Sequence, residues 1–146
     1  MDNVLTTAEI WIDKLRLTTN LILHLANDTK LPNGWGKREL LIHLTGWDEE
    51  FINFSEKMRQ QVMFYEFYED KGEEKNQQFL RDNEHLDLDS ALLKFKKLRE
   101  KLISVYEEIL IDYPQDNEEF LGFFSIWWHD LHHLKQTGID VSKLEN

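Results

Sequence analysis

Apolar residues recur at intervals of three and four along most of this chain, the spacing at which side chains share one face of an α-helix. Two stretches, residues 40–58 and 91–109, keep a strict 4-3-4-3-4 spacing. The two prolines, Pro32 and Pro114, fall between such stretches, where they do not interrupt a helix. The pattern predicts four long helices, at about residues 6–27, 36–68, 88–113 and 116–137.

Four helices with sustained heptad-like stripes predict one all-α domain over residues 1–146, a four-helix bundle. Residues 69–87 are polar and charged, and we interpret them as a long connection between the second and third helices. A connection of this length can cross the bundle, so that these two helices run parallel. This length permits an up-down-down-up bundle and points toward it, while a plain up-down-up-down bundle stays the alternative at this point.

Three histidines are candidate metal ligands. His129 and His133 lie four residues apart in the last predicted helix, so their side chains share one side, a turn apart. His43, near the start of the second helix, lies at the same end of the bundle only in the up-down-down-up topology. Together they would form a metal site of neutral imidazoles with open coordination positions. Two simpler interpretations remain. The spacing of four between His129 and His133 can arise by chance, and His132 could replace either of them. His43 can also be a hydrogen-bonded interior residue without a metal.

The helical phase of the last helix places its apolar stripe opposite these histidines. At about 100° per residue the two faces are nearly opposed, so both cannot face the interior of one monomer. We predict that the histidines and Ile126 face the interior and that the aromatic stripe meets a second subunit, giving a homodimer. In the alternative, the stripe is the core face and the histidines are exposed. The stripe consists of Phe120, Phe124, Trp127, Leu131 and Leu134.

Composition narrows the class of protein. Hydrophobic residues make up 41% of the 146 residues, which is enough apolar volume for a packed core. The formal net charge of −11 disfavours nucleic acids and anionic membranes as partners. The absence of cysteine excludes disulfides, thiolate metal sites and a cysteine nucleophile. With no basic N-terminal region and no long apolar run, we expect a cytoplasmic protein. The acidic run 48–50 is interpreted as a solvated helix face.

Two short motifs resemble those of the DinB-like superfamily. Trp35 and His43 match its Trp-x7-His entry into the second helix, followed here by Trp47. His129, His133 and Gln136 match its pattern of two histidines four apart that precede a glutamine. The order of the motifs, the helix count and the long connection after the second helix also agree, so the resemblance covers most of the chain.

The resemblance implies an up-down-down-up bundle, often dimeric, with a divalent metal, zinc or nickel first, on His43, His129 and His133. Members with known chemistry include transferases that use bacillithiol, mycothiol or glutathione as a low-molecular-weight thiol co-substrate. Trp47, one turn from His43, is the best candidate to wall the pocket for the small-molecule substrate, and we predict that Trp47 and Gln136 contribute to cofactor binding. A related ClbS/DfsB-like branch, which protects against a reactive metabolite, implies a hydrolase as one alternative.

The expected chemistry is attack of a small thiol on an electrophile held against the aromatic wall. A thiol that coordinates a metal loses its proton, and the lack of cysteine agrees with a nucleophile supplied from outside. A metal-bound hydroxide would give hydrolysis at the same site. The other alternative is a non-enzymatic bundle that binds or sequesters an apolar small molecule in its aromatic pocket.

Overall fold

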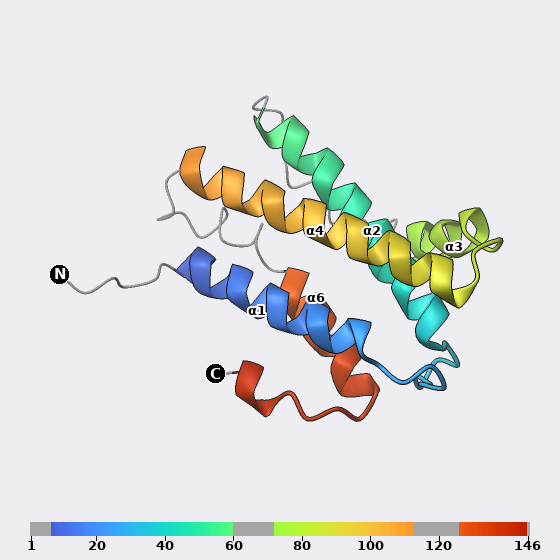
Figure 1. Cartoon of the computed structure of the whole chain (residues 1–146). Helices are drawn as coiled ribbons and strands as arrows, with labels where there is room; N and C mark the ends of the chain where they lie inside the picture. The colour runs from blue at the N-terminus through green and yellow to red at the C-terminus, as the bar shows by residue number, and fades with distance from the viewer. Residues whose placement is uncertain (1–6, 60–71, 113–125, 146) are drawn as a thin grey trace.

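The computed structural model of the chain describes residues 7–59, 72–112 and 126–145 (Figure 1). Within these ranges the chain forms α-helices and one short 3-10 helix, with no strand beyond an isolated bridge between Lys30 and Gly36. This confirms the prediction of an all-α protein. The helices are α1 (Thr7–Leu23), α2 (Lys37–Arg59), α3 (Gly72–Asp82), α4 (Leu88–Asp112), α6 (Ile126–Gln136) and the 3-10 helix η2 (Ser142–Leu144).

The first helix ends earlier than the predicted residue 27, because a side chain from the next helix caps it. The ammonium group of Lys37, at the start of α2, donates hydrogen bonds to the carbonyl oxygens of Leu23 (3.2 Å) and Leu25 (2.7 Å). A cation at this place satisfies the free carbonyl groups at the end of α1 and complements its dipole. The turn that follows reaches α2 through Gly34, whose φ of 92° only glycine adopts without strain.

Residues 69–87 are not the plain polar connection that the sequence suggested, because helix α3 forms within them. Its one large aromatic residue, Phe79, packs edge-on against Trp47 of α2, with ring centroids 5.4 Å apart. The backbone of α2 allows this close approach at Gly46, where an added Cβ would lie 2.3 Å from Phe79 Cγ. Phe79 and its neighbour Leu80 are the only apolar residues of α3, so the segment has no apolar stripe to reveal it.

Replacing Gly46 by alanine is therefore expected to displace α3 and to lower the free energy of unfolding by about 1–3 kcal/mol, the usual effect of overpacking. Urea denaturation measures this change. Gly72→Ala is the matched control, because no atom lies within 4 Å of a Cβ at that position. A Gly46→Ala protein as stable as the control would contradict the docking of α3 through this contact.

Helices α1, α2, α4 and α6 pair two by two, α2 with α4 and α1 with α6, and α1 also packs on α4 (Figure 1). Helix α4 lies along α2: Ala91 and Ile42 line one small cavity near the start of both helices, and further along the rings of Tyr106 and Phe51 lie 6.2 Å apart. These pairs advance in the same direction along α2 and α4. Helix α6 lies along α1, and the contact between Trp11 and Trp127 is one of those that join the two helices.

On α6, the apolar stripe is buried within the single chain. Trp127 packs against Trp11 of α1 with centroids 5.9 Å apart, and Leu131 and Leu134 have no exposed surface. The argument that this stripe and the histidines cannot both be buried in one monomer is therefore wrong for these residues. Helix α6 packs on α1 with one face and directs its histidines toward α2 with another. The homodimer stays a prediction, and Phe120 and Phe124 lie outside the described residues.

The predicted continuation of the second helix to residue 68 and the predicted start of the last helix near residue 116 also lie outside the described residues. Across the parts of the chain that are described, none of the helices combines the length and the apolar character needed to cross a bilayer.

Candidate metal centre

Three histidine side chains from two helices meet at one point. His43 lies in the second turn of α2, and His129 and His133 lie one turn apart on α6. The Nε2 atom of His43 lies 3.1 Å from that of His129 and 3.2 Å from that of His133, and the last two are also 3.2 Å apart. The three residues are the predicted set, and the structure brings all of them together.

The spacing of these nitrogens fits a single divalent ion. Two imidazole nitrogens about 2.0–2.1 Å from one zinc ion are about 2.9 Å apart at a right angle and about 3.3–3.4 Å apart at the tetrahedral angle. The observed distances of 3.1–3.2 Å lie between these limits. Three ligands in this arrangement occupy one side of an ion and leave at least one position for a small molecule.

Burial keeps the three imidazoles neutral, the form that binds metals. Burial, together with the neighbouring His129 and His133, lowers the pKa of His43 to about 2. Burial, with the proximity of His133, likewise lowers the pKa of His129 to about 4. Burial lowers the pKa of His133 too, although the hydrogen bond that His133 donates to Gln136 acts in the opposite direction. Without a metal, therefore, the three imidazoles of the folded cluster carry no positive charge at neutral pH.

We expect the metal-free protein to lose stability as the pH falls below about 6.5, the ordinary pKa of histidine. Below that pH the unfolded chain binds protons on these histidines, while the folded state resists protonation of His129 down to about pH 4 and of His43 to about pH 2. Since the unfolded state then binds more protons on these histidines, their contribution to the free energy of unfolding decreases as the pH falls. Urea denaturation between pH 7.5 and 4.5, with a chelator present, measures the slope.

A His43→Gln variant should show a shallower slope in this titration, because it removes the most strongly perturbed group. The exposed His85, outside the cluster, provides the control His85→Gln, which should keep the slope of the parent protein. Equal slopes for all three proteins would contradict a neutral, buried cluster.

Gln136 orients one of the three ligands. Its Oε1 lies 3.0 Å from His133 Nδ1, so the ring donates its Nδ1 proton there and leaves Nε2 free to bind a metal. The Gln136 amide nitrogen lies 3.4 Å from Nε2 of His132, which is exposed and outside the cluster. The structure thus places Gln136 behind a ligand, and its predicted role in cofactor binding stays a prediction.

Aromatic rings flank His43 on its own helix and on the preceding turn. The Trp35 ring lies against it, with centroids 5.0 Å apart. Trp47, one helical turn after His43, donates a hydrogen bond from Nε1 to Asn76 Oδ1 on α3 (2.7 Å). Both tryptophans are half-buried, which agrees with the predicted aromatic wall, although its role in substrate binding stays a prediction.

Asn76 is a residue of the site that the sequence did not reveal. The Nδ1 atom of His43 is buried and has no hydrogen-bond partner among the described residues. Asn76 stands next to it, and its side chain favours the protonated form and so opposes the lowered pKa of His43. When Nε2 binds a metal, Nδ1 carries the proton and needs an acceptor nearby, which is the usual arrangement around metal-bound histidines.

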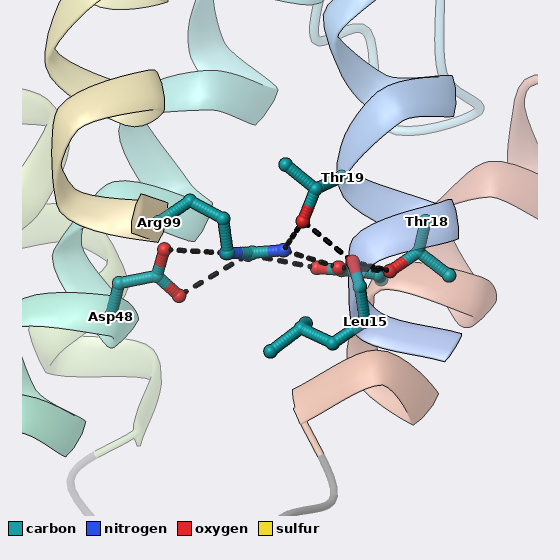
Figure 2. A network of polar contacts seen from close by, with 6 residues as sticks. Leu15, Thr18, Thr19, Asp48 and Arg99 are labelled. Carbon is teal, nitrogen blue, oxygen red and sulfur yellow. Dashed lines mark hydrogen bonds and ion pairs between the residues drawn. The ribbon is translucent and has the colours of Figure 1, made fainter. Parts of the chain in front are cut away.

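A second buried polar cluster lies in the interior and was also missed. Asp48, interpreted as part of a solvated face, is only 1% exposed and pairs with the guanidinium of Arg99 of α4, which is fully buried (Figure 2). Arg99 also pairs with Asp130 of α6, next to His129 in the chain. Burial raises the pKa of Asp48 to about 6, although Arg99 lowers it. For Arg99, burial alone would lower the pKa, but Asp130 and Asp48 raise it overall, so the guanidinium stays charged.

Comparisons of the chain with protein-family models, with curated proteins and with solved structures find no match. The resemblance to the DinB-like superfamily therefore rests on the residues themselves and on the all-helical structure with its buried three-histidine cluster.

Proposed function

We propose that the protein is a divalent-metal-dependent enzyme of the DinB-like type, which transfers a low-molecular-weight thiol to an electrophilic small molecule. The observation that carries the proposal is the convergence of three buried imidazole nitrogens, from His43, His129 and His133, at distances of 3.1–3.2 Å. Neutral imidazoles packed this closely cannot satisfy one another's lone pairs, whereas a shared cation satisfies all three.

We also propose the up-down-down-up topology that the family resemblance implies. The parallel course of α2 and α4, seen in their contacts and in Figure 1, supports it. Contacts between α1 and α6 also advance together, from Trp11 with Trp127 to Thr18 with Asp130, whose hydrogen bond is 2.7 Å long. The start of α2 lies beside the end of α1, where Lys37 binds the carbonyl oxygens of Leu23 and Leu25, which favours an antiparallel arrangement of those two helices.

The residues around the cluster suit thiol chemistry. A divalent ion held there would act as a Lewis acid that lowers the pKa of a bound thiol or water. His43 and His129 stay neutral and so leave the ion its full charge, while Gln136 fixes the ring of His133. Since the chain has no cysteine, the thiol must come from a small molecule. The exposed parts of Trp35 and Trp47 offer apolar surface for an electrophile beside His43.

The transferase activity can be tested with zinc- or nickel-loaded protein, 1-chloro-2,4-dinitrobenzene, and bacillithiol, mycothiol or glutathione in turn. In this reaction the sulfur bonds to the ring carbon, chloride leaves with the electrons of the broken C–Cl bond, and the thiol proton passes to solvent. We expect product formation above background with at least one thiol, and loss of it in His133→Ala but not in His85→Ala.

A metal-loaded protein that gives only the background rate with all three thiols would contradict the transferase proposal. Quenching of tryptophan fluorescence by an apolar ligand that persists in a His43→Ala/His129→Ala double variant would then favour the non-enzymatic binding bundle. Metal-dependent hydrolysis of an ester probe without thiol would instead favour the hydrolase.

A further inference from the structure

The two helices that carry the candidate ligands pack mainly on other helices. Among the described helices, α2 packs chiefly against α4 and α6 chiefly against α1, and direct backbone contacts between α2 and α6 are few. The three imidazole rings therefore meet across a gap between two helices that pack on each other only weakly. Helix α4 also packs on α1, which joins the two pairs, so side-chain contacts that reach both α2 and α6 then determine how closely His43 approaches His129 and His133.

The Arg99 guanidinium bridges this gap. It makes paired hydrogen bonds to the two carboxylate oxygens of Asp48 on α2, 2.9 and 3.2 Å long (Figure 2). On its other side it makes paired hydrogen bonds to Asp130 on α6, 2.5 and 3.1 Å long. One planar group from α4 thus connects both ligand-bearing helices, although α4 contributes no ligand itself.

The guanidinium has no unused donor. Besides the four bonds to the carboxylates, Arg99 donates one hydrogen bond to the hydroxyl of Thr19 (3.0 Å), which completes its five N–H groups. The Thr18 hydroxyl donates a further bond to Asp130 (2.7 Å). Because Arg99, Asp48 and Asp130 are at most 1% exposed, water cannot replace any of these contacts. A fully satisfied buried network of this kind permits one arrangement of its helices.

The bridge lies close to the ligands along each helix. Asp130 directly follows His129, and Asp48 comes five residues after His43. Helices are rigid over one or two turns, so the positions of the two carboxylates determine where the imidazole rings lie. The network contains two carboxylates and one guanidinium, so its formal net charge is negative. This net charge favours the binding of a cation nearby.

We propose that Arg99 is a positioning residue for the metal centre: through Asp48 and Asp130 it holds α2 and α6 at the separation that preorganises His43, His129 and His133 for one ion. This inference rests on the proposed metal binding. Arginine suits the task because its planar fork binds two carboxylates in pairs, whereas the ammonium of lysine has three donors and no fixed plane.

The test is titration with Co²⁺ of metal-free, tag-free protein, followed by its visible absorption and by calorimetry. We expect Arg99→Lys to weaken Co²⁺ binding by about tenfold or more, the usual effect of losing a partner behind the ligands, and to change the d–d absorption band. Arg16→Lys is the matched control, because Arg16 bridges Asp13 and Glu107 at the surface between α1 and α4. It should keep the Kd and spectrum of the parent protein.

Asp48→Asn provides the second variant, since it keeps the shape of the side chain and should fold if Arg99→Lys does not. It should likewise weaken Co²⁺ binding and alter the spectrum. Variants that are less stable but bind Co²⁺ with the parent Kd and the parent spectrum, measured well below their Tm, would overturn the inference and leave Arg99 a stabilising residue only. If the parent protein itself binds no Co²⁺, the proposed metal function fails, and the inference with it.

Discussion

Zinc or nickel ions should raise the Tm of the metal-free, tag-free protein by about 5–10 °C when the free ion is about 100 times its Kd. Binding to the folded state alone adds about 2.7 kcal/mol of stability under that condition. In a chain of this size each kcal/mol raises Tm by about 2–4 °C. The expected increase comes from the convergence of His43, His129 and His133, which does not exist in the unfolded chain. Differential scanning fluorimetry with and without a chelator measures it.

His133→Ala and His43→Ala should each abolish most of this increase, because two remaining imidazoles bind an ion much more weakly than three. His85→Ala should preserve it, since that exposed residue lies outside the cluster. An equal increase in all four proteins would show that the ion stabilises the chain elsewhere, and would contradict the site.

Replacing Arg99 by methionine should lower the free energy of unfolding by about 3–5 kcal/mol, the largest effect that we expect from a single substitution. The change leaves the carboxylates of Asp48 and Asp130 buried without their cation, and an unpaired buried charge is strongly destabilising. Urea denaturation at neutral pH measures the loss.

The control for this substitution is Arg16→Met, which removes an arginine whose ion pairs lie at the surface. Exposed pairs contribute at most about 1 kcal/mol, so Arg16→Met should change stability little. If Arg99→Met were no more destabilising than Arg16→Met, the buried network would not hold the helices together as described.

The sequence predicted the core positions of the long helices well, because apolar periodicity reports directly on the buried face. Leu40, Leu44 and Phe51 on α2, and Phe95 and Leu102 on α4, were all expected to face the core and are buried. The histidine cluster was predictable for a similar reason: a spacing of four on a helix and one distant histidine define a site once the helix directions are chosen.

Other features depend on contacts that a linear pattern does not encode. Helix α3 contacts α2 through one aromatic residue, Phe79, which packs over Gly46. Because α3 has no apolar stripe, the sequence pattern did not predict it. The sequence predicted a solvated Asp48 because its neighbours along the chain are acidic. Its burial is favourable only because the side chain lies opposite Arg99. The burial of α6 on two faces depends on the packing of α1 against one of them, which the spacing of residues along α6 does not encode.

The central claim is that His43, His129 and His133 bind one divalent ion through their Nε2 atoms. Anomalous diffraction at the zinc absorption edge, from crystals grown with zinc ions, tests it most directly. We predict a single strong peak about 2.0–2.1 Å from each of the three Nε2 atoms. An anomalous map with no peak between these histidines, at a zinc concentration that gives peaks elsewhere on the molecule, would contradict the claim.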